Sequence, residues 1–285
     1  MKRLSGLVLV LMCLALGTAA AQDPRPYLAL GDSIPFGYNP TVALGDLVDY
    51  HGYPQSVSAA LNLALSNASC PGQTSASFIN VAAPDNGCNE WRAFPLPLFM
   101  TYSSLAQSQL NYAVSFLLQN PGTSLVTLTI GGDDLLRLRN NCTEQFMNDP
   151  AMIENCELAG LGDVLVTFAK NLTDIYLAIR FEARYEGRIV AVNYLSSDYA
   201  NAIETTSLAE LNGITLGLTT LFGGRVADAF SAFKEASAAS GGLPCAPGVG
   251  LAFPNAAAPG GCDVHPTTLG QQLIAHLVVK ALRQD

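Results

Sequence analysis

Three residues that could do chemistry interrupt an apolar stretch near the start of the chain. Residues 27–30 have the character of a buried strand, and Gly31, Asp32 and Ser33 follow it directly. These residue types are common in turns, so a simple turn is one interpretation. The other is a nucleophilic serine at the carboxyl end of a strand, where open α/β sheets bind their ligands. Ser33 is therefore the candidate nucleophile.

A serine nucleophile needs a base that takes its proton, and histidine is the usual one. The chain has three histidines. His51 lies in a polar stretch, and His276 lies within an expected helix. His265 follows an acid, Asp263, by two residues and directly precedes Pro266. Because a proline disfavours helix at the residue before it, we expect His265 in a loop just ahead of a helix, as the general base.

Apolar stretches with the periodicities of strands and helices alternate along the chain. The predicted strands cover residues 27–30, 77–83, 124–132, 188–195 and 224–230, and the predicted helices cover 53–67, 103–122, 161–187, 207–222 and 267–284. Such alternation is typical of βαβ units, which build a mostly parallel sheet with helices on both faces. Residues 31–33 and 131–134 each follow a strand at its carboxyl end, where such sheets bind ligands.

The composition is that of a packed globular protein, with 49% hydrophobic and 13% charged residues among 285. A formal net charge of −9 makes nucleic acid a poor partner. We expect residues 22–285 to form one domain.

Residues 1–21 combine two basic residues, a short apolar stretch and small residues at the end. This is the pattern of a secretory signal peptide. A membrane anchor is the alternative, but the apolar stretch is shorter than the ~20 residues that span a bilayer. The residues before Cys13 lack the small side chain of a lipoprotein site. We therefore expect a secreted protein, extracellular or periplasmic, without a stable membrane anchor.

The six cysteines after the predicted signal peptide favour disulfides in an exported chain. They form three neighbouring couples: Cys70 with Cys88, Cys142 with Cys156, and Cys245 with Cys262. Pairing within each couple is the prediction, although six cysteines allow 15 connectivities. A zinc site is the alternative, but the sequence has no CxxC pair. Neither a metal nor a cofactor is predicted.

Four stretches resemble, in order, the sequence blocks of the SGNH, or GDSL, esterases and lipases. They are residues 31–33, 67–80, 126–135 and 263–275, and the likeness extends over nearly the whole mature chain. The resemblance implies a flavodoxin-like three-layer α/β/α sandwich with a mostly parallel five-stranded sheet. It also implies a serine carboxylic ester hydrolase without a cofactor, acting on lipid or other small-molecule esters.

The resemblance implies a role for particular residues. Ser33 corresponds to the nucleophile, His265 to the general base, and the backbone N–H groups of Ser33 and Gly72 to two oxyanion donors. A glycine suits that position because the backbone can then approach a bound oxyanion closely.

Two positions depart from the family's blocks. Asp133 occupies the place of an asparagine that donates to the oxyanion, and loss of one donor typically costs about 100- to 1,000-fold in rate. Either the site works with a weaker oxyanion hole, or burial and Asp134 keep Asp133 protonated. Asp263 precedes His265 by two residues rather than three, so either Asp263 or a backbone carbonyl orients the imidazole.

An aromatic stretch over residues 89–102 is a candidate wall for the acyl chain or the alcohol. Its aromatic side chains are Trp91, Phe94, Phe99 and Tyr102. Ordinary loop packing is the alternative for them.

Lipid or simple acyl esters are the favoured substrates, and the alternative within the same fold is a carbohydrate O-acetylesterase. An alternative of another class is a secreted ligand-binding protein with impaired catalysis, for which Asp133 would be the sign. We expect a monomer.

Overall fold

Five parallel strands form the central sheet of the computed structural model, which describes residues 23–42, 50–93, 102, 104–147, 149–257 and 259–283. The strands are β1 (Arg25–Gly31), β2 (Leu63–Asn67), β3 (Leu125–Thr129), β4 (Arg188–Val192) and β5 (Arg225–Ala227). Their order across the sheet is β2–β1–β3–β4–β5. The expected signal peptide lies outside the described residues.

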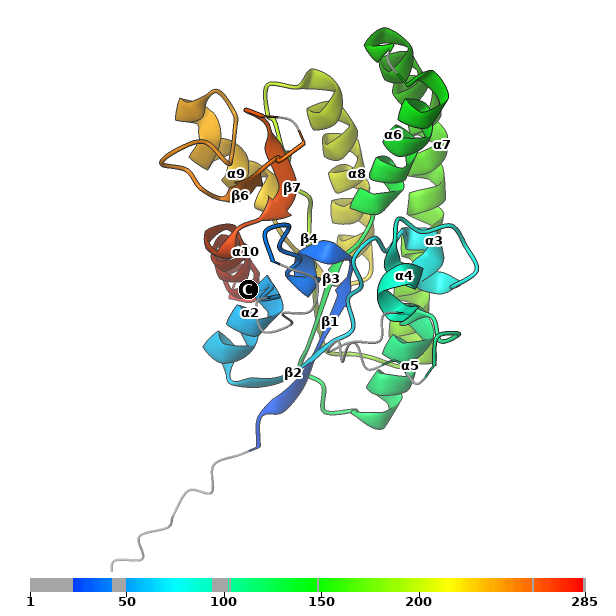
Figure 1. Cartoon of the computed structure of the whole chain (residues 1–285). Coiled ribbons are helices and arrows are strands. Elements are labelled where there is room, and N and C mark those ends of the chain that lie inside the picture. Colours follow the sequence, from blue (N-terminus) through cyan, green and yellow to red (C-terminus); the bar gives the residue numbers. More distant parts are fainter. Residues whose placement is uncertain are drawn as a thin grey trace, which may run out of the picture.

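Helices cover both faces of this sheet (Figure 1). On one face, α2 (Tyr53–Leu61) and α10 (Thr268–Ala281) pack against each other. On the other lie α5 (Gln109–Gln119), α7 (Pro150–Leu177) and α8 (Ala202–Leu221). The prediction of an α/β fold with a five-stranded, mostly parallel sheet is therefore confirmed.

The remaining elements are shorter or lie beyond the sheet. They are α1 (Ser33–Phe36), α3 (Ser75–Ile79), α4 (Cys88–Ala93), α6 (Gly132–Phe146), a π-helical turn that continues α7 (Ala178–Glu182), α9 (Ala229–Ser237), a 3-10 turn (Ala238–Ser240), and the antiparallel pair β6 (Ala252–Pro254) and β7 (Cys262–Pro266). Within the described ranges, no helix has both the length and the apolar character that crossing a bilayer requires.

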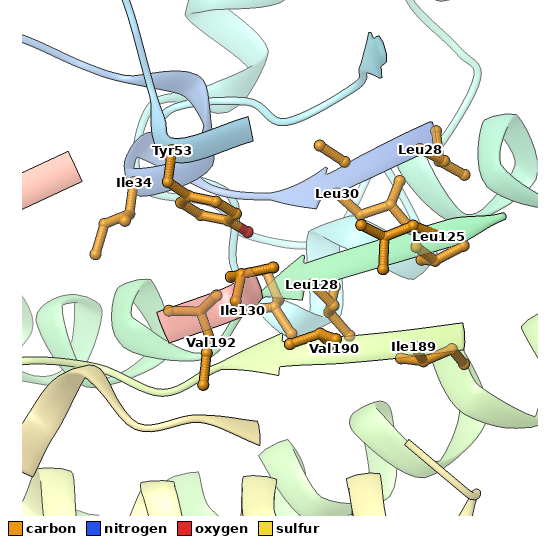
Figure 2. Close-up of a cluster of buried hydrophobic side chains, with 14 of the residues drawn as sticks. Leu28, Leu30, Ile34, Tyr53, Leu125, Leu128, Ile130, Ile189, Val190 and Val192 are labelled. Carbon is orange, nitrogen blue, oxygen red and sulfur yellow. The ribbon is translucent and has the colours of Figure 1, made fainter. Parts of the chain in front are cut away.

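The core lies between the sheet and its two helical layers (Figure 2). Leu28, Leu128 and Val190 come from three adjacent strands, and all three are buried. Strands that are covered on both faces have near-continuous apolar sequences, and all five residues of β3 are indeed buried. The buried hydroxyl of Tyr53 is paired with that of Thr129 at 2.9 Å, so the polar end of this large side chain is satisfied.

The predicted helix over residues 53–67 extends too far. Helix α2 ends at Leu61, because Asn62 adopts a left-handed conformation with φ of +50°. Residues 63–67 then form β2, which pairs in parallel with β1. The helical spacing of the apolar residues continues through this segment, but pairing with β1 determines its structure.

The predicted strand over residues 77–83 is wrong, because this segment begins as helix α3. Thr74 and Ser77 form a reciprocal capping box, in which each side chain accepts the other's backbone N–H, both at 3.1 Å. The second strand along the chain is instead β2. The long helix predicted from residue 161 begins earlier, at Pro150, which occupies its first turn.

Candidate active site

Ser33 is the first residue of α1, directly after the carboxyl end of β1. Gly31 makes this turn possible: its φ is +132°, and a Cβ there would lie 1.9 Å from the carbonyl oxygen of Thr129. The Asp32 carboxylate caps α1 by accepting the N–H of Ile34 at 3.0 Å. The chain thus turns sharply and presents a serine side chain at the edge of the sheet.

His265 meets Ser33 from the other end of the chain, and its Nε2 lies 3.0 Å from the serine Oγ. It stands on β7 rather than in the loop that Pro266 indicated, because β7 pairs with β6. Helix α10 begins directly afterwards, with Thr267 as its N-cap. The Cys245–Cys262 disulfide ties the start of β7 to the preceding loop.

Asp263 reaches the imidazole despite its short spacing from His265. Its Oδ1 lies 2.5 Å from Nδ1 of His265 and also accepts the His265 backbone N–H at 2.9 Å. The two residues are two apart on a strand, and side chains with that spacing lie on the same face. A carboxylate only accepts hydrogen bonds, so Nδ1 carries the proton and Nε2 is free to take one from Ser33.

The surroundings of Asp263 keep it ionised. Burial raises the pKa of this carboxyl, but hydrogen bonds and attraction from His265 outweigh the burial and hold the pKa below its usual value. Asp263 is therefore a charged partner for the imidazole at any pH near neutrality.

Gly72 lies in the loop that follows β2. Its φ is +79°, and a Cβ at this position would lie 2.3 Å from the carbonyl oxygen of Asn86. The Gly72 carbonyl in turn accepts the Asn86 N–H at 2.8 Å. Only a glycine fits this close approach of two backbone segments, which the Cys70–Cys88 disulfide holds together.

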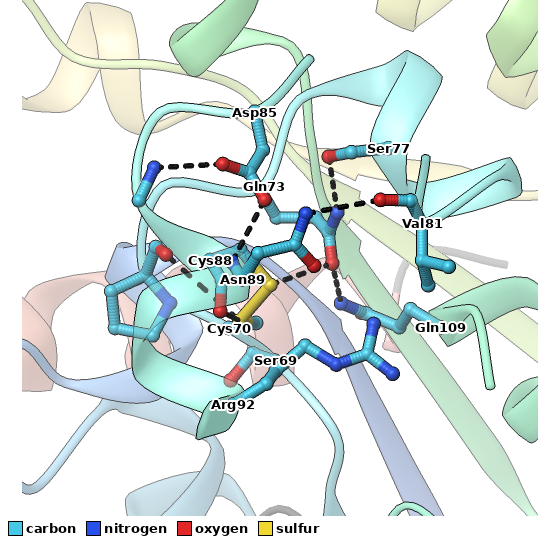
Figure 3. The surroundings of a disulfide bond; sticks show 12 residues. Ser69, Cys70, Gln73, Ser77, Val81, Asp85, Cys88, Asn89, Arg92 and Gln109 are labelled. Carbon is cyan, nitrogen blue, oxygen red and sulfur yellow. Dashed lines mark hydrogen bonds between the residues drawn. A yellow bond between two sulfur atoms is a disulfide. The ribbon is translucent and has the colours of Figure 1, made fainter. Parts of the chain in front are cut away.

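Two buried amide side chains, Gln73 and Gln109, lie beside the Cys70–Cys88 disulfide (Figure 3), and Gln109 connects this loop to the Ser33 turn. Gln109 donates to the Gly31 carbonyl at 3.0 Å and accepts the Gly31 N–H at 2.5 Å. The same Gln109 amide donates to Gln73 at 3.1 Å, and the Cys70 N–H also donates to the Gly31 carbonyl, at 3.0 Å. The segments that carry Ser33 and Gly72 are thus held in one network, which sequence patterns did not reveal.

Asp133 lies in the first turn of α6 and is 5% exposed. Its Oδ1 accepts a hydrogen bond from the Asn86 side-chain amide at 3.0 Å. Burial raises the pKa of Asp133 well above its usual value, and repulsion from Asp32 and Asp134 raises it further, against the lowering effect of Asn86. These surroundings favour the protonated acid.

Asp32 is the second buried carboxyl of this cluster, and it has better donors. The Tyr194 hydroxyl donates to its Oδ2, and the Ile34 N–H donates to its Oδ1. Burial raises the pKa of Asp32 to about 7, while these two hydrogen bonds lower it. Asp32 accepts two hydrogen bonds and Asp133 accepts one, so this arrangement favours the charge on Asp32 and the proton on Asp133 when the two carboxyls share one proton.

Tyr194 was not among the residues that the sequence singled out. It follows β4 at its carboxyl end, within an apolar stretch that looks like ordinary strand. Asp134 also has a defined role, because its carboxylate accepts the N–H and the hydroxyl of Ser75 at 2.8 and 2.6 Å and so anchors α3.

Two of the four predicted aromatic contacts, Trp91 and Tyr102, are described by the structure, and Trp91 adjoins His265 through the ring of Tyr38. The Trp91 ring is 5.8 Å from that of Tyr38, and the Tyr38 ring is 4.6 Å from that of His265. Tyr102 has other partners: its hydroxyl donates to the Ala68 carbonyl, and the Arg92 guanidinium lies 4.3 Å from its ring centre. The other two predicted aromatic residues, Phe94 and Phe99, lie outside the described residues.

A cavity of about 570 Å³ opens beside Ser33 and Asp133. The part of the chain that the structure describes has no group of three or more His, Cys, Asp or Glu side chains arranged to hold a metal ion. The six cysteines that could have served as ligands are joined as Cys70–Cys88, Cys142–Cys156 and Cys245–Cys262, which is the neighbouring pairing expected from the sequence.

A parallel α/β sheet with helices on both faces, and a serine, a histidine and an acid brought together at its carboxyl edge, is an arrangement shared by many α/β hydrolases. The family model described as GDSL-like lipase/acylhydrolase matches residues 27–278. The chain belongs to this family and is a carboxylic ester hydrolase.

Solved structures with the same fold include other ester hydrolases. Phospholipase A1 from Streptomyces albidoflavus matches with a TM-score of 0.58 and 20% identity, over 90% of this chain and 98% of that one. The extracellular lipase from Streptomyces rimosus matches with a TM-score of 0.57 and 18% identity, over 90% and 99%. Axe2, an acetylxylan esterase from Geobacillus stearothermophilus, matches with a TM-score of 0.52 and 14% identity, over 92% and 95%. At these identities the likeness is one of fold. No curated protein matches the sequence.

Proposed function

We propose that this chain is a secreted serine esterase or lipase that forms an acyl-enzyme on Ser33. The main support is the hydrogen-bonded series from Asp263 through His265 to Ser33, with distances of 2.5 and 3.0 Å. This arrangement has the roles of a catalytic triad: an acid that orients the base, a base with its free nitrogen at the nucleophile, and a hydroxyl at the open edge of the sheet.

Acylation begins when Oγ of Ser33 attacks the acyl carbon of the ester. Nε2 of His265 takes the hydroxyl proton, and the carbonyl oxygen becomes an oxyanion. Asp263 keeps the imidazole in position and stabilises its positive charge. When the tetrahedral intermediate collapses, the alcohol leaves with the proton from Nε2, and the acyl group remains on Ser33.

Deacylation uses the same groups with water as the nucleophile. Nε2 of His265 takes a proton from the water, whose oxygen attacks the acyl carbon. Collapse of the second intermediate breaks the bond to Ser33 Oγ, which recovers its proton from the imidazole. The products are the carboxylic acid and the free enzyme, and no cofactor is needed.

The oxyanion is stabilised by the backbone N–H groups of Ser33 and Gly72, with Asp133 as a third donor in its protonated form. A neutral carboxyl group has one O–H to donate, whereas its anion would repel the oxyanion. The burial of Asp133 and the nearby charge of Asp32 support this protonation state.

The substrates in this proposal are lipid or simple acyl esters, and the protein acts as a secreted monomer without a membrane anchor. Three disulfides and the signal-like pattern of residues 1–21 support export. Trp91 and its aromatic neighbours are candidates for contact with the alcohol part, because they adjoin His265 through Tyr38.

A fluorophosphonate probe and p-nitrophenyl esters from acetate to palmitate test the proposal together. The parent should hydrolyse at least one ester and carry the label on the peptide that contains Ser33. Ser33→Ala should remain folded but lose both the label and the hydrolysis. A folded parent that shows neither reaction would contradict the proposal and favour a ligand-binding protein of the same fold.

A further inference from the structure

A second cavity lies at the opposite end of the sheet from Ser33. Its volume is about 600 Å³, and it is formed by the start of β1, the end of α5 with the loop that leads to β3, and the segment before β4. Strand β1 begins at Arg25 in this cavity and ends at Gly31 beside the catalytic serine, a length of about 20 Å. The second cavity is therefore separate from the candidate active site.

The charge of this cavity is opposite to that of the whole chain. Three exposed arginines line it: Arg25, Arg184 and Arg188. Among the described residues that line the cavity, Glu186 is the one acid, so the lining has a net charge of +2. The formal net charge of the chain is −9. A positive cavity on an acidic protein attracts anions to one place on its surface.

The three guanidinium groups in this cavity have no structural task of their own. In the part of the chain that the structure describes, no ion pair or hydrogen bond involves any of them. The neighbouring Arg180 is different, because it donates to the carbonyls of Tyr185 and Gly187, both at 2.8 Å. Arg180 therefore holds the backbone, whereas the N–H groups of the three lining arginines are available to an anion.

The register of the sheet places Arg25 and Arg188 on the same face. Tyr27 of β1 pairs with Leu125 of β3, and Leu125 pairs with Arg188 of β4. Residues paired in this way point to one face, and Arg25 precedes Tyr27 by two residues, so its side chain points there too. Strands β1 and β4 flank β3, which puts their backbones about 10 Å apart. Two long arginine side chains at this spacing can contact one anion from opposite sides.

The segment that carries Arg184 is held in an unfavourable conformation. The φ of Arg184 is +53°, in the left-handed region that non-glycine residues rarely adopt. The next residue fixes the segment at both ends: the N–H of Tyr185 donates to the Ile179 carbonyl at 3.1 Å, and its hydroxyl donates to the Arg188 carbonyl at 3.0 Å. This wall of the cavity is therefore preformed, which reduces the entropy lost when a ligand binds.

We propose that this second cavity binds a terminal phosphate group. Such a group carries about −1.5 to −2 charges at neutral pH, which complements the net charge of the lining, and the guanidinium fork binds its oxygens in pairs. The group occurs both on small soluble phosphate esters and on the headgroup of phosphatidic acid. Leu118, which is 56% exposed, and Pro121 also line the cavity and offer an apolar edge to the rest of either molecule. The site requires no reaction at Ser33.

Two binding measurements test this proposal: calorimetric titration with glycerol 1-phosphate, and sedimentation with phosphatidylcholine vesicles that contain or lack phosphatidic acid. Each arginine near an anionic group contributes about fivefold in affinity, so the double variant Arg184→Gln/Arg188→Gln should bind about 25-fold more weakly than the parent. Lys170→Gln/Lys234→Gln is the matched control, because it removes the same charge from exposed positions on α7 and α9. The control should bind like the parent.

Binding to glycerol 1-phosphate alone would identify a soluble ligand, and binding to the vesicles only when they contain phosphatidic acid would identify the lipid headgroup. A parent that binds neither probe, or equal losses in the two double variants, would overturn the proposal. Arg25→Gln lies on a different segment and should lose about fivefold by itself, so the test does not depend on one loop. Circular dichroism checks that each variant is folded. Failure of the proposed function is distinct, because a parent without esterase activity would still bind the phosphate group.

Discussion

Asp263 and Asp133 are two acids of the candidate active site that lie in opposite surroundings. Asp263 has a side chain that is 24% exposed and contacts a histidine ring at 2.5 Å. Asp133 is 5% exposed, accepts one amide hydrogen bond and is repelled by three other carboxyls. The pKa of Asp263 is therefore lowered, and that of Asp133 is raised.

In the proposed mechanism, this difference lets one residue type serve both sides of an ester hydrolysis. Where positive charge develops on the imidazole, an anion is useful, and Asp263 remains an anion. Where negative charge develops on the oxyanion, a donor is useful, and a protonated Asp133 is a donor. Environment, not residue type, assigns the roles.

Removal of the base should give the largest effect. His265→Ala leaves only binding and the oxyanion donors, so kcat/KM should fall by about 10⁴- to 10⁶-fold. His276→Ala is the control, because His276 is exposed on α10, and it should retain full activity. Steady-state hydrolysis of a p-nitrophenyl ester measures both. Similar rates in the two variants would remove His265 from the mechanism.

Removal of the negative charge of Asp263 should give the second-largest effect. Asp263→Asn leaves the size of the side chain but not its charge, and the loss should be about 10⁴-fold in kcat. Asp163→Asn, at an exposed position on α7, should have no effect. If Asp263→Asn keeps activity within tenfold of the parent, a backbone carbonyl orients the ring instead.

The buried acid should behave in the opposite way. Asp133→Ala removes a donor and should lose about 100- to 1,000-fold in rate. Asp133→Asn supplies another donor of nearly the same volume and should stay within about threefold of the parent at neutral pH. Because the pKa of Asp133 is raised, its donating form is present below that pKa and disappears as the pH rises through it.

A pH–rate profile therefore distinguishes the parent from Asp133→Asn. The parent should lose activity on the alkaline side, and the Asn variant should lack that loss. If Asp133→Asn were instead 10-fold or more faster at neutral pH, Asp133 would be ionised and the comparison of the two acids would fail.

The smallest expected effect concerns the position of the shared proton. Tyr194→Phe removes the hydroxyl that donates to Asp32, so the proton moves from Asp133 toward Asp32 and the rate should fall several-fold. In the Asp133→Asn background the same change should have almost no effect, because an amide donates its hydrogen bond whether Asp32 is protonated or ionised. A double-mutant cycle on kcat measures this coupling. Equal effects in both backgrounds would mean that Tyr194 acts through packing alone.

The residues of the site were easier to predict from sequence than the elements that hold them. Ser33 stands out because polar residues follow an apolar stretch at the end of an expected strand, and His265 stands out because an acid precedes it by two residues and a proline follows it. Strand β2 was not predictable, because its residues continue the helical spacing of α2 and only pairing with β1 makes them a strand. Helix α3 was missed because its apolar residues look like a strand, and the capping box that starts it spans only four residues.

The contact between Asp263 and His265 depends on the pairing of β7 with β6, which no local sequence pattern predicts. Counted along the chain, the acid is one residue too near to fit the family's blocks. The pairing of β7 with β6 extends the backbone and restores the contact. Tyr194 carried no signal at all, since its contact with Asp32 depends on the position of β4 next to β3 in the sheet.

The disulfides divide the molecule into regions of unequal resistance to reduction. Each closes a short loop, with its cysteines 18, 14 and 17 residues apart, and such a loop is worth about 3 kcal/mol in the chain-entropy account. None of the six cysteines lies in the five-stranded sheet. The first disulfide holds the segment that carries Gly72, the second joins helices α6 and α7, and the third holds the start of β7, the strand that carries His265. Under reducing conditions these segments should open locally while the sheet persists, so that amide exchange would increase around the active site before it increases in the core.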